Sequence, residues 1–488
     1  MPTHSGSAPG PLTLYLGAVL ALAACSPETP AGTTTGELDL PALQSDRVSV
    51  CHAQDARSRI LEVGLPALAD HLAHGDYVTT LLVSHAGLPA NGVNFGRITD
   101  ALAAARSGRL ARGELVTAAC RITIVVSAET YQGTAGVASG AVEQFPLVFD
   151  VPQITLRGAL VMGLDGTGRA TGTGTGDEET TLTPVEPLPF VGGLSTPIVV
   201  ANAHPGGSAG NGLIVTGFVF QSGHNPAVDA GGQGVLSVRT TDLTVKGNRF
   251  EGGFTESIDI RSGAVAVVEN HLLGGAGTCD ICLAGPGSFV ATGNRLGTGG
   301  IPGIIVAGMV NLPLPAGVEP YDLPATAETW AVVRNNEVHD HLRLPVGSGI
   351  RVDGLGIGAP NVHNTVHADI RDNLLVNNRF GMIVHAGFVV ANTGRRSDVD
   401  VSISGNVFQQ SCQANMLVSL ARHTTALGIS NTLYLLNSTF SLSLNGNLDW
   451  NDVWYGHPAG FGNTLIVDGN TIDNGIRQFY DAAGCPNL

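Results

Sequence analysis

A short run of alternating apolar and polar residues, followed by an asparagine, recurs along this chain. Leu243 and Val245 alternate with polar neighbours and are followed by Asn248. This period of two is typical of a strand with one buried face, and the asparagine is typical of a turn. The apolar pair always lies five and three residues before the turn residue, which is Phe218 in an early copy. The asparagines are Asn248, Asn270, Asn294, Asn336, Asn373, Asn406, Asn447 and Asn470.

A second apolar pair follows each of six turns, 9 to 14 residues after the asparagine. Its first members are Ile258, Ile281, Ile304, Ile350, Met382 and Met416. Short strands without helices between them cannot bury their faces singly, but they can if successive coils stack. The pattern therefore predicts an all-β fold, a right-handed parallel β-helix solenoid, with the asparagines in one structural row. A sandwich or propeller is disfavoured, because the strand-turn-strand register is constant while the total spacing varies.

The repeat resembles that of pectate-lyase-like β-helix proteins, and its asparagines resemble that family's asparagine ladder. Residues 76–132, with Phe95-Gly96-Arg97-Ile98 and Glu129-Thr130-Tyr131-Gln132, resemble a domain of unknown function that opens such β-helices in bacteria. The resemblance implies a β-helix over residues 77–488. A helix is expected near 96–106, and it would cover the N-terminal end of the solenoid. Its apolar face consists of Ile98, Ala101, Leu102 and Ala105.

The first residues predict export. Residues 12–22 form an apolar run that is too short to span a membrane and suits a signal peptide. Leu22-Ala23-Ala24-Cys25 resembles a bacterial lipobox, which implies cleavage after residue 24 and lipidation of Cys25. Residues 1–25 would then be a lipoprotein signal peptide with its lipobox, and residues 26–47 a flexible tether rich in Pro, Thr, Gly and Ser. We expect an extracytoplasmic protein, lipid-anchored to the bacterial envelope at the outer membrane or cell surface. Plain secretion is the alternative, because no Lys or Arg precedes the apolar run.

Residues 48–76 form a segment that contains cysteine and histidine. Cys51, His52, His71 and His74 are residue types that bind zinc. The alternative is that Cys51 forms a disulfide, as an oxidising compartment favours. Without Cys25 six cysteines remain, and their connectivity cannot be deduced. Cys51 with Cys120 would tie this segment to the first coils, and Cys412 with Cys485 would tie the C-terminal tail.

A further cysteine pair, Cys279-Asp280-Ile281-Cys282, has the spacing of a redox motif. Thioredoxin-like chemistry needs a helix N-terminus to stabilise the thiolate, whereas Ile281 belongs to a strand ladder. We therefore expect a disulfide in a turn, or two cysteines with other partners. Residues 166–183, rich in Gly and Thr, are expected to form a loop that leaves the coil.

Charge narrows the possible partners. The net charge is −16, and charged residues make up only 13% of the chain. Nucleic acid and anionic membrane surfaces are disfavoured by this acidic balance. Contact with a membrane is therefore expected through the lipid anchor alone. A polysaccharide or cell-surface glycan is the partner that the resemblance implies.

The register of the strands also identifies side chains that point outward from the solenoid. Two charged groups stand out among mostly apolar positions: Asp259 with Arg261, and Arg351 with Asp353 and His385. In related lyases and hydrolases such a face carries calcium-binding or acid/base carboxylates beside an Arg or Lys. We assign Arg351, Asp353 and His385 as candidate catalytic residues and Asp259 and Arg261 as candidate binding residues. Surface ion pairs are the alternative.

Three functions remain open. The first is a carbohydrate-binding or adhesive surface protein without catalysis, which the absence of the polygalacturonase and alginate-lyase signatures favours. The second is a polysaccharide lyase or glycoside hydrolase with an atypical site, although no aspartate pair is expected on adjacent coils. The third is a structural or assembly protein that uses the apolar outward positions. The cofactor is calcium, zinc or none.

Overall fold

The computed structural model describes one compact unit, within Asp46–Leu488. It describes residues 47–54, 57–85, 93–110, 120–135, 142–175, 178–184, 190–191, 194–195, 197–202, 212–222, 232–273, 278–299, 302–308, 324–342, 347–354, 363–386, 396–411, 414–420, 431–436, 439–440, 453–456, 464–468 and 476–477. The predicted signal peptide with Cys25 and the tether up to residue 46 lie outside these ranges. So do Cys412, Cys485, Asn447 and Asn470.

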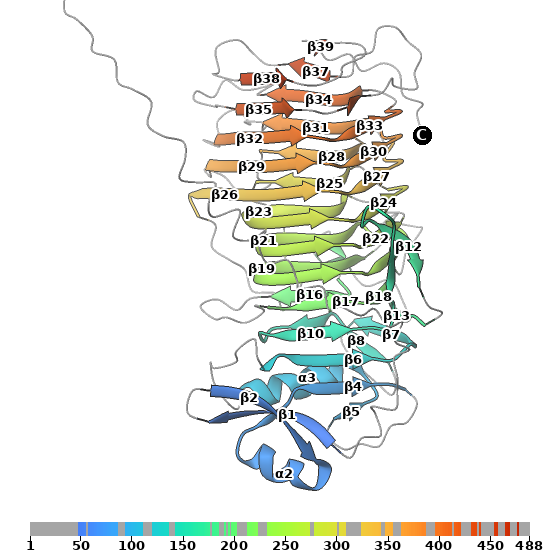
Figure 1. Ribbon diagram of the computed structural model, residues 1–488, viewed down its shortest axis with the longest axis vertical. Coiled ribbons are helices and arrows are strands. Elements are labelled where there is room, and N and C mark those ends of the chain that lie inside the picture. Colours follow the sequence, from blue (N-terminus) through green and yellow to red (C-terminus); the bar gives the residue numbers. More distant parts are fainter. Residues whose placement is uncertain are drawn as a thin grey trace, which may run out of the picture. The chain divides into compact units, whose positions relative to one another are not determined.

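The chain winds as a right-handed parallel β-helix, as the sequence predicts, and its coils have three faces (Figure 1). The first face contains β9 (Leu147–Phe149), β16 (Val199–Asn202), the first halves of β19 (Gln233–Lys246), β21 (Glu256–Val268) and β23 (Cys279–Thr292), then β25 (Pro302–Ala307), β28 (Ser348–Asp353), β31 (Phe380–Ala386), β34 (Ala414–Leu420), β37 (Val453–Gly456) and β39 (Ile476–Arg477).

The second face contains β4 (Thr80–Val83) with β5 (Asn94–Phe95), β6 (Ile122–Val126), β10 (Ile154–Arg157), β17 (Ile214–Thr216), the second halves of β19, β21 and β23, then β26 (Thr326–Arg334), β29 (His363–Arg371), β32 (Arg396–Ser404), β35 (Asn431–Leu436) and β38 (Thr464–Asp468).

The third face contains β8 (Glu143–Phe145), β7 (Thr130–Ala135), β13 (Thr180–Pro184), β18 (Phe218–Gln221), β20 (Arg249–Glu251), β22 (His271–Leu273), β24 (Arg295–Gly297), β27 (Glu337–His339), β30 (Leu374–Val376), β33 (Val407–Gln409) and β36 (Thr439–Phe440). A separate short hairpin joins β14 (Phe190–Val191) to β15 (Leu194–Ser195).

Apolar ladders fill the interior of the solenoid. On the first face the six residues from Ile258 to Met416 that the spacing identified pair in register and are fully buried. On the third face the ladder runs through Phe220, Phe250, Leu272, Leu296, Val338, Leu375 and Phe408. Burying one such side chain stabilises a fold by roughly 1.5–3 kcal/mol. Because each coil adds a rung to every ladder, stability accumulates along the stack.

The asparagine row joins the coils at the turn between the second and third faces. From Asn248 to Asn373, each backbone N–H donates to the side-chain Oδ1 of the next rung at 3.0 Å. Each Nδ2 donates to the same oxygen at 2.8–3.1 Å. Six of the eight predicted asparagines, Asn248 to Asn406, form this ladder, and Phe218 begins it by donating its N–H to Asn248.

The residue before each rung has a left-handed conformation, which makes the turn. These residues are Gly217, Gly247, Glu269, Gly293, Asn335, Asp372 and Gly405, with φ between 52° and 80°. Six of the seven are Gly, Asn or Asp, the types that adopt this conformation with least strain. A Gly, Asn or Asp directly before an asparagine is therefore the sequence signal of this turn.

The N-terminal part of the described chain is a small sheet and two helices. The strands β2 (Arg57–Gly64), β1 (Arg47–Gln54) and β3 (Tyr77–Val78) pair antiparallel in that order, and α2 spans Leu65–Ala73. The helix α3, Ile98–Leu110, packs against β4, β6 and β9 at the end of the solenoid (Figure 1). Its predicted apolar face is buried. In the described ranges, neither helix has the length and apolar character that crossing a membrane requires.

Residues 166–175 leave the coil, as the composition predicts, but they are not an irregular loop. They belong to a hairpin of β11 (Met162–Leu164) and β12 (Ala170–Gly174), followed by β13 of the third face. In Figure 1, β12 lies beside β22 and β24 and crosses several coils. Arg169 donates to the carbonyl oxygens of Asn335 and Asp372 at 3.3 and 3.2 Å, and Asn335 Nδ2 donates to the Thr167 carbonyl at 2.8 Å. The hairpin is held there by backbone acceptors of later turns, which composition does not reveal.

Candidate functional site

The structure brings Arg351, Asp353 and His385 together on the outward side of the first face. Asp353 on β28 pairs in register with His385 on β31. Arg351 Nη2 donates to Asp353 Oδ2 at 2.6 Å, and His385 Nδ1 lies 3.5 Å from Asp353 Oδ1. The side chains are 19%, 14% and 9% exposed in that order. The carboxylate is thus held between a guanidinium and an imidazole, and part of the group faces solvent.

The strands next to this group differ from those of the earlier coils. On β19, β21 and β23 the chain passes from the first face to the second within one strand. From β25 onward, the first-face and second-face strands of each coil are separate elements, and residues 308–325, 354–362, 387–395, 421–430 and 457–463 lie between them. The first three of these intervals begin within two residues of Ala307, Asp353 and His385, which are paired neighbours in one row.

Aromatic and charged side chains lie on the second face of the same coils. Trp330 on β26 stacks on His367 of β29, with ring centroids 3.8 Å apart and planes 12° apart. His367 Nδ1 lies 3.5 Å from Asp400 Oδ2 on β32. These three residues form one outward row, because Trp330 pairs with His367 and His367 with Asp400. Aromatic and charged side chains on adjacent coils can contact the apolar faces and hydroxyl groups of a ligand together.

The other predicted charged pair, Asp259 and Arg261, is not an accessible binding pair. Arg261 is 1% exposed and Asp259 is 4% exposed. Arg261 donates from Nε and Nη2 to Asp259 Oδ2 at 2.9 and 2.7 Å, and Gln233 donates to the same oxygen at 2.8 Å. Gln233 also donates to Glu256. The expectation of an exposed binding site was wrong. The strand register shows that both side chains point away from the interior, but it does not show whether other residues cover them.

Burial perturbs two carboxyl groups near this network. Burial, with the negative charge of Asp259, raises the pKa of Glu256 to about 7. Cys279 and Cys282 form a disulfide within β23, in register with Glu256 and Asp259. Between them, Asp280 is fully buried, and burial raises the pKa of its carboxyl group well above the usual value. Sequence reasoning missed Glu256, because nothing in the pattern distinguishes it from an exposed carboxylate.

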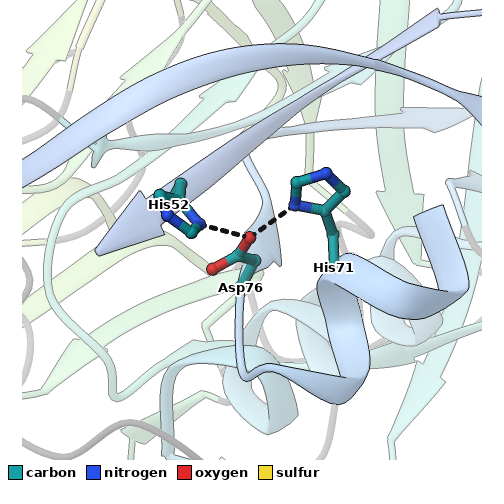
Figure 2. Close-up of side chains that lie close together, drawn as sticks. All are labelled: His52, His71 and Asp76. Atoms are coloured by element: carbon teal, nitrogen blue, oxygen red, sulfur yellow. Dashed lines mark hydrogen bonds and ion pairs between the residues drawn. The ribbon is translucent and has the colours of Figure 1, made fainter. Parts of the chain in front are cut away.

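The predicted zinc ligands are corrected in the N-terminal segment. Cys51 is bonded to Cys120, so its sulfur is not a thiolate ligand. His74 is exposed and lies outside the cluster that does form. Figure 2 shows this cluster, in which His52 and His71 both face Asp76. His52 Nδ1 lies 2.8 Å and His71 Nδ1 2.7 Å from Asp76 Oδ2, and the Asp76 side chain is fully buried.

Local folding explains how Asp76 meets both histidines. Gly75, with φ of 82°, ends α2 in a left-handed conformation. The N–H of Gly75 donates to Leu72 and the N–H of Asp76 to His71, the paired bonds of a Schellman motif. Asp76 is thereby turned back onto the ring of His71. Cys51 on β1 pairs with Tyr77 on β3, which places His52 opposite Asp76. A helix-ending glycine followed by Asp was the sequence signal for this third residue.

The fold defines this chain as a right-handed parallel β-helix. No protein-family model and no curated protein matches the sequence. Solved structures with a distantly similar fold include the following two. One is the catalytic unit of a thermostable GH87 α-1,3-glucanase from Streptomyces thermodiastaticus, at 15% identity and TM-score 0.40, covering 82% of this chain and 72% of that one. The other is the A-module of the mannuronan C-5 epimerase AlgE6 from Azotobacter vinelandii, at 12% identity and TM-score 0.32, covering 78% and 96%.

Proposed function

We propose that this chain is an envelope-anchored surface protein that binds a polysaccharide or cell-surface glycan, without catalysis, around Arg351, Asp353 and His385. One observation carries the proposal: a guanidinium, a carboxylate and an imidazole lie together, partly exposed, on adjacent coils of the first face. A solenoid can contact several units of an extended chain, because like positions repeat on adjacent coils. The stacked rings of Trp330 and His367 lie on the second face of the same coils.

Features of the remaining chain support an extracytoplasmic location. The disulfides Cys51–Cys120 and Cys279–Cys282 are typical of proteins that fold in an oxidising compartment. The apolar run of residues 12–22 and the lipobox-like sequence ending at Cys25 supply an export signal and an anchor. With this anchor, the glycan is expected in the envelope or outside the cell.

Glycan binding is tested with the purified chain against immobilised acidic and neutral polysaccharides, with and without calcium. Arg351→Ala is expected to weaken binding about tenfold or more, the usual cost of losing a charge-assisted hydrogen bond. Arg157→Ala is the matched control, since Arg157 is exposed on the distant strand β10. Equal binding by both variants, or no binding of any glycan by the unaltered chain, contradicts the proposal.

A polysaccharide lyase or hydrolase is the second candidate function, and the contacts of Asp353 favour it. A carboxylate between an imidazole and a guanidinium can exchange a proton while positive charge faces an acidic substrate. The group holds one carboxylate, so it suits removal of a proton next to a uronate better than hydrolysis by a carboxylate pair. Absorbance of unsaturated products and release of reducing ends report turnover. Turnover that disappears in Asp353→Ala establishes this candidate, and binding without turnover rejects it.

A further inference from the structure

We infer that His52, His71 and Asp76 form a binding site for a divalent transition-metal ion of the zinc type. The nitrogen and oxygen atoms that they offer lie within 4.8 Å of one another. Two imidazoles and one carboxylate suit zinc and its neighbours, whereas calcium and magnesium prefer oxygen ligands alone. The site lies in the N-terminal segment and involves none of the residues of the proposed glycan site.

The three side chains are positioned by three independent features of the fold. The Schellman motif at Gly75 directs Asp76 toward His71. The pairing of β1 with β3 brings His52 to the same carboxylate. The disulfide between Cys51 and Cys120 fixes the residue next to His52 to the first coils of the solenoid. Such preorganisation reduces the ordering that ion binding would otherwise require.

The observed distances describe a hydrogen-bonded arrangement that a small shift converts to ligation. Both Nδ1 atoms lie 2.7–2.8 Å from Asp76 Oδ2. Bonds of about 2.0–2.1 Å to a tetrahedral ion separate its ligand atoms by about 3.3 Å. Each nitrogen–oxygen separation must therefore lengthen by about half an ångström, and both Nδ1 atoms must release their protons.

The exposure of the rings permits that shift and gives an ion access. The side chain of His52 is 17% exposed and that of His71 is 27% exposed, whereas the Asp76 carboxylate is buried. A buried carboxylate supplies the negative charge that compensates the ion, and the rings reach it from the solvent side. Three protein ligands leave a coordination position for water, as in zinc sites that exchange a ligand.

The test uses the full chain with its disulfides intact, and Zn²⁺ and Co²⁺ as probes. Calorimetry with Zn²⁺ and the visible absorbance of bound Co²⁺ are expected to show one site per chain. His52→Ala and His71→Ala are expected to weaken binding at least 100-fold, since removing even an outer partner costs about 10–100-fold. His74→Ala is the matched control, because His74 is exposed and only three residues from His71. Far-UV circular dichroism checks that each variant is folded.

Three results overturn the inference. The first is no saturable binding by the unaltered chain, which leaves Asp76 as a hydrogen-bond acceptor for two imidazoles and nothing more. The second is an equal loss of metal affinity in His74→Ala and His71→Ala. The third comes from X-ray absorption of the zinc-loaded chain and requires no variant: a sulfur shell near 2.3 Å in place of nitrogen and oxygen near 2.0 Å places the ion elsewhere. Asp76→Asn, which keeps the side-chain shape, is expected to weaken binding as the histidine variants do.

Discussion

Replacing a middle rung of the asparagine ladder by alanine is expected to destabilise the solenoid strongly. In Asn294→Ala, Oδ1 no longer accepts from the N–H and Nδ2 of Asn270. The Nδ2 donations to Val267 and to Asn336 are lost as well. Four buried hydrogen bonds at about 1 kcal/mol each give a loss of about 4 kcal/mol, and the orphaned N–H of Asn270 adds to it.

Two assays report this loss. The midpoint of urea unfolding, followed by far-UV circular dichroism, is expected to fall. Hydrogen exchange measured by mass spectrometry is expected to accelerate around Asn270, by about 1,000-fold if the coil opens locally. Thr292→Ala is the control, because Thr292 lies two residues before the rung and is partly exposed. It is expected to change stability by less than about 0.5 kcal/mol. Equal midpoints and exchange rates for the two variants refute the reasoning.

Three further predictions follow from buried contacts. Glu256 has a folded pKa of about 7 against an ordinary 4.5, so its contribution to stability is fully present below about pH 4.5 and is lost as the pH rises through about 7. Glu256→Gln is accordingly expected to exceed the unaltered chain in urea midpoint at about pH 8 but not at about pH 5, and a constant difference contradicts this. The disulfide Cys51–Cys120 closes a separation of 69 residues. Replacing both cysteines by serine is expected to cost up to about 4 kcal/mol, seen as faster hydrogen exchange in residues 47–54, and unchanged exchange is the contrary result. Gly172 has φ of 85°, and an added Cβ would clash with the His271 ring. Gly172→Ala is therefore expected to release the β11–β12 hairpin and expose residues 162–174 to exchange, whereas retained protection excludes this packing.

The features that repeat were predictable from the sequence, because each copy confirms the position of the others. The spacing of apolar pairs placed Ile258 and Met382 in one interior ladder. The same register aligned Asp353 with His385, which are separated in sequence but adjacent in the solenoid. In a parallel stack, register alone converts sequence positions into neighbours.

The features that occur once were not predictable in this way. The burial of Arg261 depends on what lies over the outward row, and strand periodicity carries no information about that. The bond between Cys51 and Cys120 confirms one of the pairings that the sequence suggested, but no repeat fixed that choice. The role of Asp76 depended on a chain reversal at Gly75 that turns a neighbour in sequence into a partner of His71.

The β11–β12 hairpin has a consequence for how the protein is made. Coils that contact only their neighbours can be added one after another as a chain is synthesised or exported. Arg169, however, donates to the carbonyl of Asp372, which is 203 residues later in the sequence. The contacts of the hairpin with β22 and β24 can form first, whereas its contact with Asp372 requires that later coils are in place. Its docking joins coils that would otherwise be independent. Truncation before Asp372 would remove this last contact of the hairpin, while its contacts with β22, β24 and the carbonyl of Gly293 would remain.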